Sequence, residues 1–268
     1  NPNTIIEAIL GRKPQSDPGK SPQTLLERIK ELDNLLVMND EAHHVHDDEL
    51  KWNESLLAIH KNLPGGLKMW VDFSATPKTP ENTYYPWIIC DYPLAQAVED
   101  RIVKVPLIVH SVNKKDPEKI TKDNVVQKYG DWISASLARW KEHNEAYKGV
   151  KKKPVLFIMA EKNAFADKIA ESIARRGATY GIDKDEIMVI HTDNSGDVKK
   201  SDLESLREEA RDVDNSKNKI KVIVSVLMLR EGWDVQNVTI VLGLRAFDSA
   251  ILPEQAIGRG LRLMRDIS

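Results

Sequence analysis

The stretch PVLFIMAEKNAFADKIAESIARR, residues 154–176, decides the fold of this chain. Its first part, 155–159, is a continuous apolar run that predicts a strand buried on both faces of a sheet. Its second part, 164–176, carries apolar residues at helical spacing and predicts an amphipathic helix. A buried strand that leads into such a helix is the repeating unit of α/β proteins. We therefore expect an α/β fold.

The same alternation continues on both sides of this stretch. After it, the pattern predicts strands at 187–191, 220–226 and 238–242 and helices at 202–213 and from about residue 253. Before it, the pattern predicts strands at 35–38, 69–73, 87–89 and 105–109 and helices at 21–33, 49–62 and 125–147. Short apolar runs that alternate with helices favour mainly parallel sheets covered on both faces.

Composition limits the classes of protein that this chain can be. Its 268 residues, 41% of them hydrophobic, are enough for one large or two modest domains. The formal net charge of −2 argues neither for nor against a nucleic-acid partner. The single cysteine, Cys90, excludes a disulfide framework and a cysteine-based zinc site. Because the apolar runs are too short for a bilayer and the first residues lack a signal core, we expect a cytoplasmic protein.

Two adjacent carboxylates, Asp40 and Glu41, follow the strand predicted at 35–38. Ligands of open parallel sheets bind at the carboxyl ends of the strands. Phosphoryl transfer needs one carboxylate for Mg²⁺ and a second group that orients the attacking water. The pair is suited to both roles, although Asp-Glu can also simply cap a turn between a strand and a helix.

Small hydroxyl residues, Ser74 and Thr76, follow the next predicted strand. They can exchange hydrogen bonds with Glu41 and with His43, so we expect a coupling role for His43 across to this loop. The alternative for the histidines near residue 43 is a structural metal site, but no cysteine completes a zinc set.

Near the C-terminus, Gln255, Arg259 and Arg262 are spaced by four and three residues. In a helix that begins near residue 253 these side chains share one face. Two arginines and an amide aimed at one point suit an anion on which charge develops, such as a transferring phosphate. The alternative is a helix with a solvated basic face. The glycines at 258 and 260 would destabilise such a helix without an evident structural benefit.

A further motif, Arg230-Glu-Gly-Trp-Asp234, follows the strand predicted at 220–226. Gly232 lets backbone approach a ligand, and Asp234 can place a carboxylate near a ribose or an arginine. Trp233 has two possible roles, stacking on a base or packing in the core, and packing is the commoner fate of a tryptophan.

Taken in order, these motifs resemble those of superfamily 2 helicases and translocases. The sequence around these motifs is similar to that of the Res subunit of type III restriction enzymes. The segments that carry this resemblance begin at Asn39 (NDEAHH), Asp72 (DFSATP), Leu229 (LREGWDV) and Leu252 (LPEQAIGRGLR).

The resemblance implies two RecA-like lobes, the first incomplete, with ATP bound between them. It places a partial first lobe at 1–113, a helical connection at 114–150 and a second lobe at 151–268. Asp40 would hold Mg²⁺, and Glu41 would position or deprotonate the attacking water. The remaining roles implied are coupling for Ser74 and Thr76, nucleotide contacts for Gln255, Gly232 and Asp234, a γ-phosphate contact for Arg259 and an arginine finger for Arg262.

The phosphate-binding loop of that family, motif I, is not found in the sequence. Gly19-Lys20-Ser21 resembles its end, but Pro14 stands where the first glycine is required. We therefore expect a fragment of an ATP-dependent DNA translocase that is inactive alone, with double-stranded DNA as a partner of the parent protein. The resemblance also implies a modification methyltransferase as a second partner. The alternatives are a stand-alone DNA or RNA helicase and a non-catalytic nucleic-acid-binding module.

Overall fold

The computed structural model describes residues 31–40, 42, 51–79, 83–109, 119–149, 153–191, 208–215, 217–226, 233, 235–244 and 257–264. The chain divides into two compact units. Unit 1 comprises Asn1–Ile89 with Ser249–Ile251, and unit 2 comprises Cys90–Asp248 with Leu252–Ser268. Among the described residues, no helix is both long enough and apolar enough to cross a bilayer.

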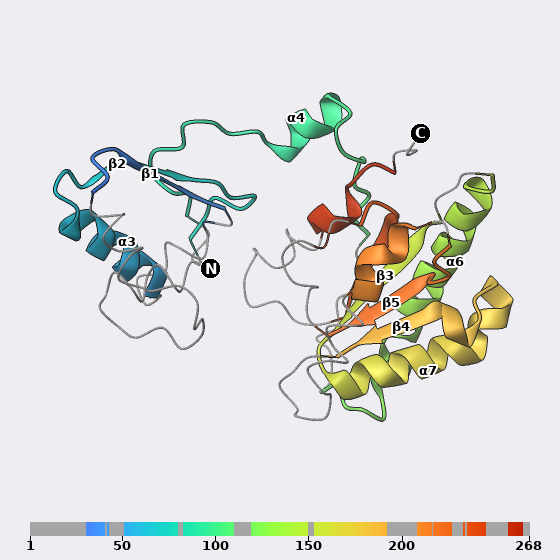
Figure 1. Ribbon diagram of the computed structural model, residues 1–268. Coiled ribbons are helices and arrows are strands. Elements are labelled where there is room, and N and C mark those ends of the chain that lie inside the picture. The colour runs from blue at the N-terminus through green and yellow to red at the C-terminus, as the bar shows by residue number, and fades with distance from the viewer. Residues whose placement is uncertain are drawn as a thin grey trace. The chain divides into compact units, whose positions relative to one another are not determined.

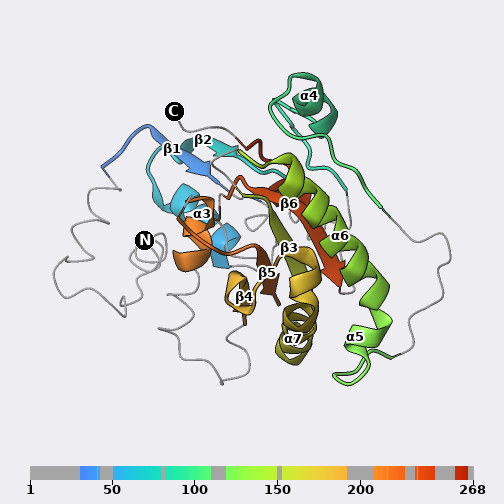
Figure 2. The ribbon, with the colours of Figure 1, turned by 90° about the vertical axis from the view of Figure 1, so that its right-hand side faces the viewer.

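Unit 2 is built on a four-stranded parallel sheet (Figures 1 and 2). Its strands are β3 (Val155–Ala160), β4 (Ile187–Ile190), β5 (Val222–Ser225) and β6 (Val238–Leu244). They lie in the order β4-β5-β3-β6, and every neighbouring pair is parallel. All six residues of β3 are buried, as expected for a central strand with both faces covered.

One face of this sheet is covered by helices. α5 (Val125–Lys128), α6 (Gly130–Ala146) and α7 (Asn163–Tyr180) pack there, and Figure 2 shows α6 and α7 on the same side of the strands. α6 buries Ile133, Leu137 and Trp140, which share one helical face because they are spaced by four and three residues. α7 ends at Gly181, whose φ of 74° is the left-handed conformation that glycine adopts without strain.

The opposite face of the sheet has its own core. Phe157, Ile223 and Val238 from the strands pack there with Ala210 and Trp233 from the connecting segments. A helical turn at 208–211 leads into the 3₁₀-helix η4 (Asp212–Asp214), and η2 (Lys184–Glu186) precedes β4. The sheet of unit 2 is therefore buried on both faces.

Unit 1 repeats the plan on a smaller scale in its described part. β1 (Leu35–Asn39) and β2 (Leu67–Asp72) form a parallel pair, joined through α3 (Lys51–Asn62). Leu56, Ile59 and Leu63 pack beneath the strands. The fold class expected from the sequence, α/β with mainly parallel sheets, is confirmed in both units.

Three local predictions are wrong. Residues 87–89 and 105–109 form no strand, and both segments carry largely exposed apolar side chains. A short helix, α4 (Leu94–Glu99), lies in the region between them. The helix predicted at 125–147 is interrupted at Tyr129, where α5 ends and α6 begins. The helix predicted at 21–33 lies almost wholly outside the described residues.

Candidate functional site

The carboxyl ends of β1 and β2 meet at one edge of the small sheet in unit 1. Asn39 is paired with Asp72 in the strand register, and its side-chain amide donates to the Asp72 carboxylate at 2.7 Å. The Phe73 amide donates to the Asn39 carbonyl, and the Ala42 amide donates to the Phe73 carbonyl. These bonds fix the backbone on both sides of Asp40, which leaves β1 at this edge as an exposed residue.

The loop after β2 places a hydroxyl in the interior. The Ser74 hydroxyl accepts a hydrogen bond from the Thr76 amide at 3.1 Å. Thr76 is 2% exposed, and its own hydroxyl has no hydrogen-bond partner among the described residues. Since a buried polar group without a partner costs about 1–3 kcal/mol, this hydroxyl is suited to exchange a bond with a neighbouring functional group.

Arg259 and Arg262 converge on one atom of unit 2. The Nη1 atoms of both donate to the carbonyl oxygen of Trp233, at 2.9 and 3.1 Å. The guanidinium carbon of Arg259 also lies 5.7 Å from the centre of the Trp233 ring. The helical turn ends at Gly260, so the two arginines do not share a helix face as the sequence predicted. They nevertheless point at the same oxygen.

Trp233 packs in the core and is 2% exposed. Its indole N–H donates to the Ala210 carbonyl at 2.8 Å, and its ring lies 5.2 Å from that of Phe157. Of the two roles that the sequence left open for Trp233, packing is therefore confirmed. Its backbone carbonyl holds the arginines, while its side chain anchors this part of the chain to the sheet.

The turn between Trp233 and β6 is held by two charged residues that sequence reasoning did not single out. The Asp214 carboxylate accepts hydrogen bonds from the amides of Gln236 and Asn237, at 2.8 and 3.0 Å. The Lys104 ammonium donates to the Gln236 and Val238 carbonyls. Burial lowers the pKa of Lys104 to about 8, and the negative charge of Asp214 opposes this shift. No local pattern identifies these residues, because their partners lie far away in the sequence.

Several residues predicted to act at the site lie outside the described residues: Glu41, His43, Gly232, Asp234 and Gln255. Of those described, Asp40, Ser74 and Thr76 belong to unit 1, and Arg259 and Arg262 belong to unit 2. No group of three or more metal-ligating side chains occurs in the described ranges. A single exposed carboxylate such as Asp40 still suits Mg²⁺, because this ion usually keeps several waters and takes its remaining ligands from substrate phosphates.

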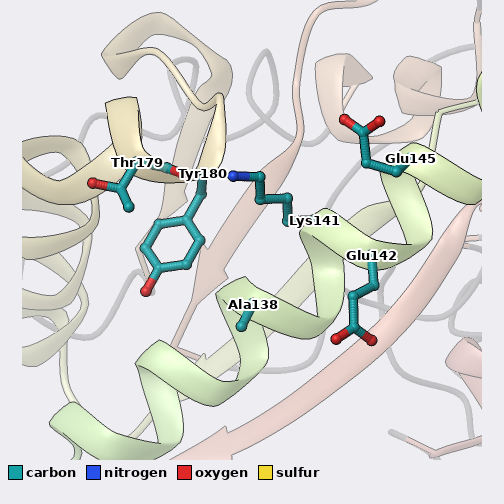
Figure 3. Close-up of a pocket in the computed structure, with 6 residues that line it drawn as sticks. All are labelled: Ala138, Lys141, Glu142, Glu145, Thr179 and Tyr180. Carbon is teal, nitrogen blue, oxygen red and sulfur yellow. Dashed lines mark hydrogen bonds between the residues drawn. The ribbon is translucent and has the colours of Figure 1, made fainter.

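A pocket of about 560 Å³ lies elsewhere in unit 2, between α6 and α7 (Figure 3). It is lined by Ala138, Lys141, Glu142, Glu145, Thr179 and Tyr180. The ammonium of Lys141 donates to the Thr179 carbonyl, and the carboxylates of Glu142 and Glu145 point in different directions. Because its polar groups do not converge, and two of its three charges are negative, this pocket does not suit a phosphate ligand.

Neither a protein-family model nor a curated protein matches the sequence. Among solved structures, helicase Lhr of Mycobacterium smegmatis, bound to ssDNA and AMP-PNP, matches 96% of this chain and 29% of its own, with a TM-score of 0.50 and 15% identity. Two weaker matches are Dbp5 of S. cerevisiae, bound to RNA and ADP BeF3, and the type ISP restriction-modification enzyme LlaBIII, bound to DNA.

Dbp5 matches 84% of this chain and 49% of its own, with 12% identity and a TM-score of 0.41. LlaBIII matches 91% and 18%, with 14% identity and a TM-score of 0.45. The chain thus spans less than half the length of each of these proteins. The similarity to Lhr supports the fold that the ordered motifs implied: the chain has an α/β fold of the RecA-like kind, with mainly parallel sheets.

Proposed function

We propose that this chain is part of an ATP-dependent motor that moves on DNA. The observation that supports this most is the convergence of Arg259 and Arg262 on one oxygen. In this proposal a phosphate oxygen would replace the Trp233 carbonyl oxygen, which accepts hydrogen bonds from both guanidinium groups. Guanidinium groups bind phosphate more strongly than a neutral carbonyl, so a nucleotide that reaches this point would compete for both arginines.

In this proposal the chain contains parts of two RecA-like lobes, placed by the motifs at 1–113 and 151–268 with a helical connection at 114–150. The two compact units divide earlier, at residue 90, and α5 and α6 of the connection pack on the sheet of unit 2. Asp40 would hold Mg²⁺ from the end of β1, and Glu41 would orient the attacking water. The buried hydroxyl of Thr76, together with Ser74 and His43, would couple hydrolysis to movement of the lobes.

The second lobe would supply the positive charge that phosphoryl transfer requires. Arg262 would act as the arginine finger, and Arg259 would contact the γ-phosphate. Gln255, Gly232 and Asp234 would complete the nucleotide contacts. Trp233 lies between Gly232 and Asp234, and its carbonyl oxygen accepts hydrogen bonds from both arginines. A substitution at Gly232 or Asp234 would therefore also change the position of Arg259 and Arg262.

The finer part of the proposal concerns the parent protein. We infer that it is the motor subunit of a type III restriction endonuclease, with double-stranded DNA as its track and a modification methyltransferase as its partner. This inference is supported by the sequences of the four motif segments, above all NDEAHH at residues 39–44 and LREGWDV at 229–235.

Phosphate release with MgATP tests the proposal, in the presence and absence of duplex DNA. The isolated chain 1–268 is expected to show no DNA-stimulated release, because motif I is not in its sequence. Robust turnover that Glu41→Gln abolishes would contradict this. The parent protein is expected to hydrolyse ATP in response to DNA. Salt-dependent DNA binding without any ATPase in the parent would instead favour a non-catalytic module.

A further inference from the structure

Lys104 lies in unit 2 between α4 and α5, in a segment that has no regular secondary structure. Its neighbours Ile102 and Val105 are exposed, whereas the Lys104 side chain is partly buried. A lysine that turns inward from an exposed apolar segment needs acceptors for its N–H groups, because an unpaired buried ammonium is costly.

Lys104 finds these acceptors in two segments that are distant in sequence. Its ammonium donates to the Val238 carbonyl at 2.7 Å and to the Gln236 carbonyl at 3.3 Å, at the start of β6. It also donates to the Gly260 carbonyl at 3.4 Å, in the helical turn that carries Arg259. The three N–H groups of the ammonium thus face three backbone carbonyls, which is the full donor capacity of the side chain.

The backbone around Lys104 adds further contacts to the same segment. The Lys104 amide donates to the Leu261 carbonyl at 2.7 Å, and Val103 forms an antiparallel bridge with Arg262. Lys104 therefore contacts the chain immediately after Arg259 and immediately before Arg262.

We propose that Lys104 is a positioning residue for Arg259 and Arg262: its ammonium fixes their segment to the turn that follows Trp233, so that both guanidiniums stay aimed at one point. The inference rests on the proposed function, because the arginines matter only if they act on a phosphate. It goes beyond that function by assigning a role to the segment between α4 and α5. A shift of that segment would move the arginines without touching the nucleotide.

The test begins with Lys104→Met, which keeps the length of the side chain and removes its donors. The matched control is Lys119→Met, at an exposed lysine that also lies between α4 and α5. Hydrogen exchange of the amides at 257–264 is expected to quicken at least tenfold in Lys104→Met only, with the amides of β3 unchanged. Lys104→Arg, which keeps charge and donors, is expected to restore most of the protection. If the methionine variant does not fold, Lys104→Gln takes its place.

The second readout is the ATPase of the parent protein. Lys104→Met is expected to lower kcat about tenfold with KM within twofold of wild type, because a misplaced arginine affects the transition state more than the ground state. Lys104→Arg is expected to recover kcat to within about threefold. Unchanged hydrogen exchange and unchanged kcat in Lys104→Met would overturn this inference and leave the proposed function standing. A parent protein without ATPase would overturn the proposed function and this catalytic role together.

Discussion

Replacing Trp233 with phenylalanine tests the packing of the segment that holds the arginines. The phenyl ring keeps an aromatic face but loses the N–H that donates to the Ala210 carbonyl at 2.8 Å. Ala210 is fully buried, so its carbonyl would have no replacement partner from water. Leaving a buried acceptor unpaired costs about 1–3 kcal/mol.

The smaller ring adds a second loss, because the Trp233 ring contacts both Phe157 and Arg259. Aromatic pairs of this kind contribute about 0.5–1.5 kcal/mol beyond their buried area. Together the two losses predict that Trp233→Phe lowers the free energy of unfolding by about 1.5–4.5 kcal/mol.

Urea unfolding of the isolated chain measures this, with the m-value as a check that the denatured state is unchanged. A change below about 0.5 kcal/mol, which is typical of a surface position, would refute the packing argument. The same variant separates packing from base stacking. Phenylalanine can still stack on a base, so a stacking residue would tolerate the change, whereas the packed residue described above would not.

Two further predictions concern stability. Because the folded chain holds the pKa of Lys104 at about 8, below the 10.5 of the unfolded chain, the unfolded state binds more protons between these values, and stability from this group rises with pH across that window. The stability of wild type relative to Lys104→Met should therefore increase between pH 7 and pH 10, and a constant difference in urea unfolding would contradict it. At Gly177 an added Cβ would collide with the backbone carbonyl of Ile182, so Gly177→Ala should cost about 1–3 kcal/mol, and an unchanged thermal midpoint would contradict the close packing there.

The strands of unit 2 could be predicted from sequence because continuous β-branched and apolar runs indicate strands that are buried on both faces. β3 is buried at every residue, and β5 is buried at every residue as well. The run at 105–109 is also mostly apolar and β-branched but forms no strand. Its proline removes one donor, and strand formation also needs a partner, which sequence composition does not report.

The candidate site was only partly predictable. Motif spacing located Arg259 and Arg262, and the structure brings both to the Trp233 carbonyl. The mechanism of their convergence was not predictable, because the helical turn ends at Gly260. Lys104 and Asp214 do not belong to any of the motifs. Their role comes from contacts that depend on how distant segments pack, and one isolated sequence has no pattern that reports such contacts.

The central claim is that Asp40 and Glu41 serve the same phosphoryl transfer as Arg259 and Arg262. DNA-stimulated ATP hydrolysis by the parent protein tests it most directly, in wild type, Glu41→Gln and Arg262→Lys. An arginine finger contributes about 10³–10⁵ to the rate, so Arg262→Lys is expected to lose at least about a thousandfold in kcat. Glu41→Gln is expected to be similarly inactive while still binding ATP. Hydrolysis at the wild-type rate in either variant would contradict the account.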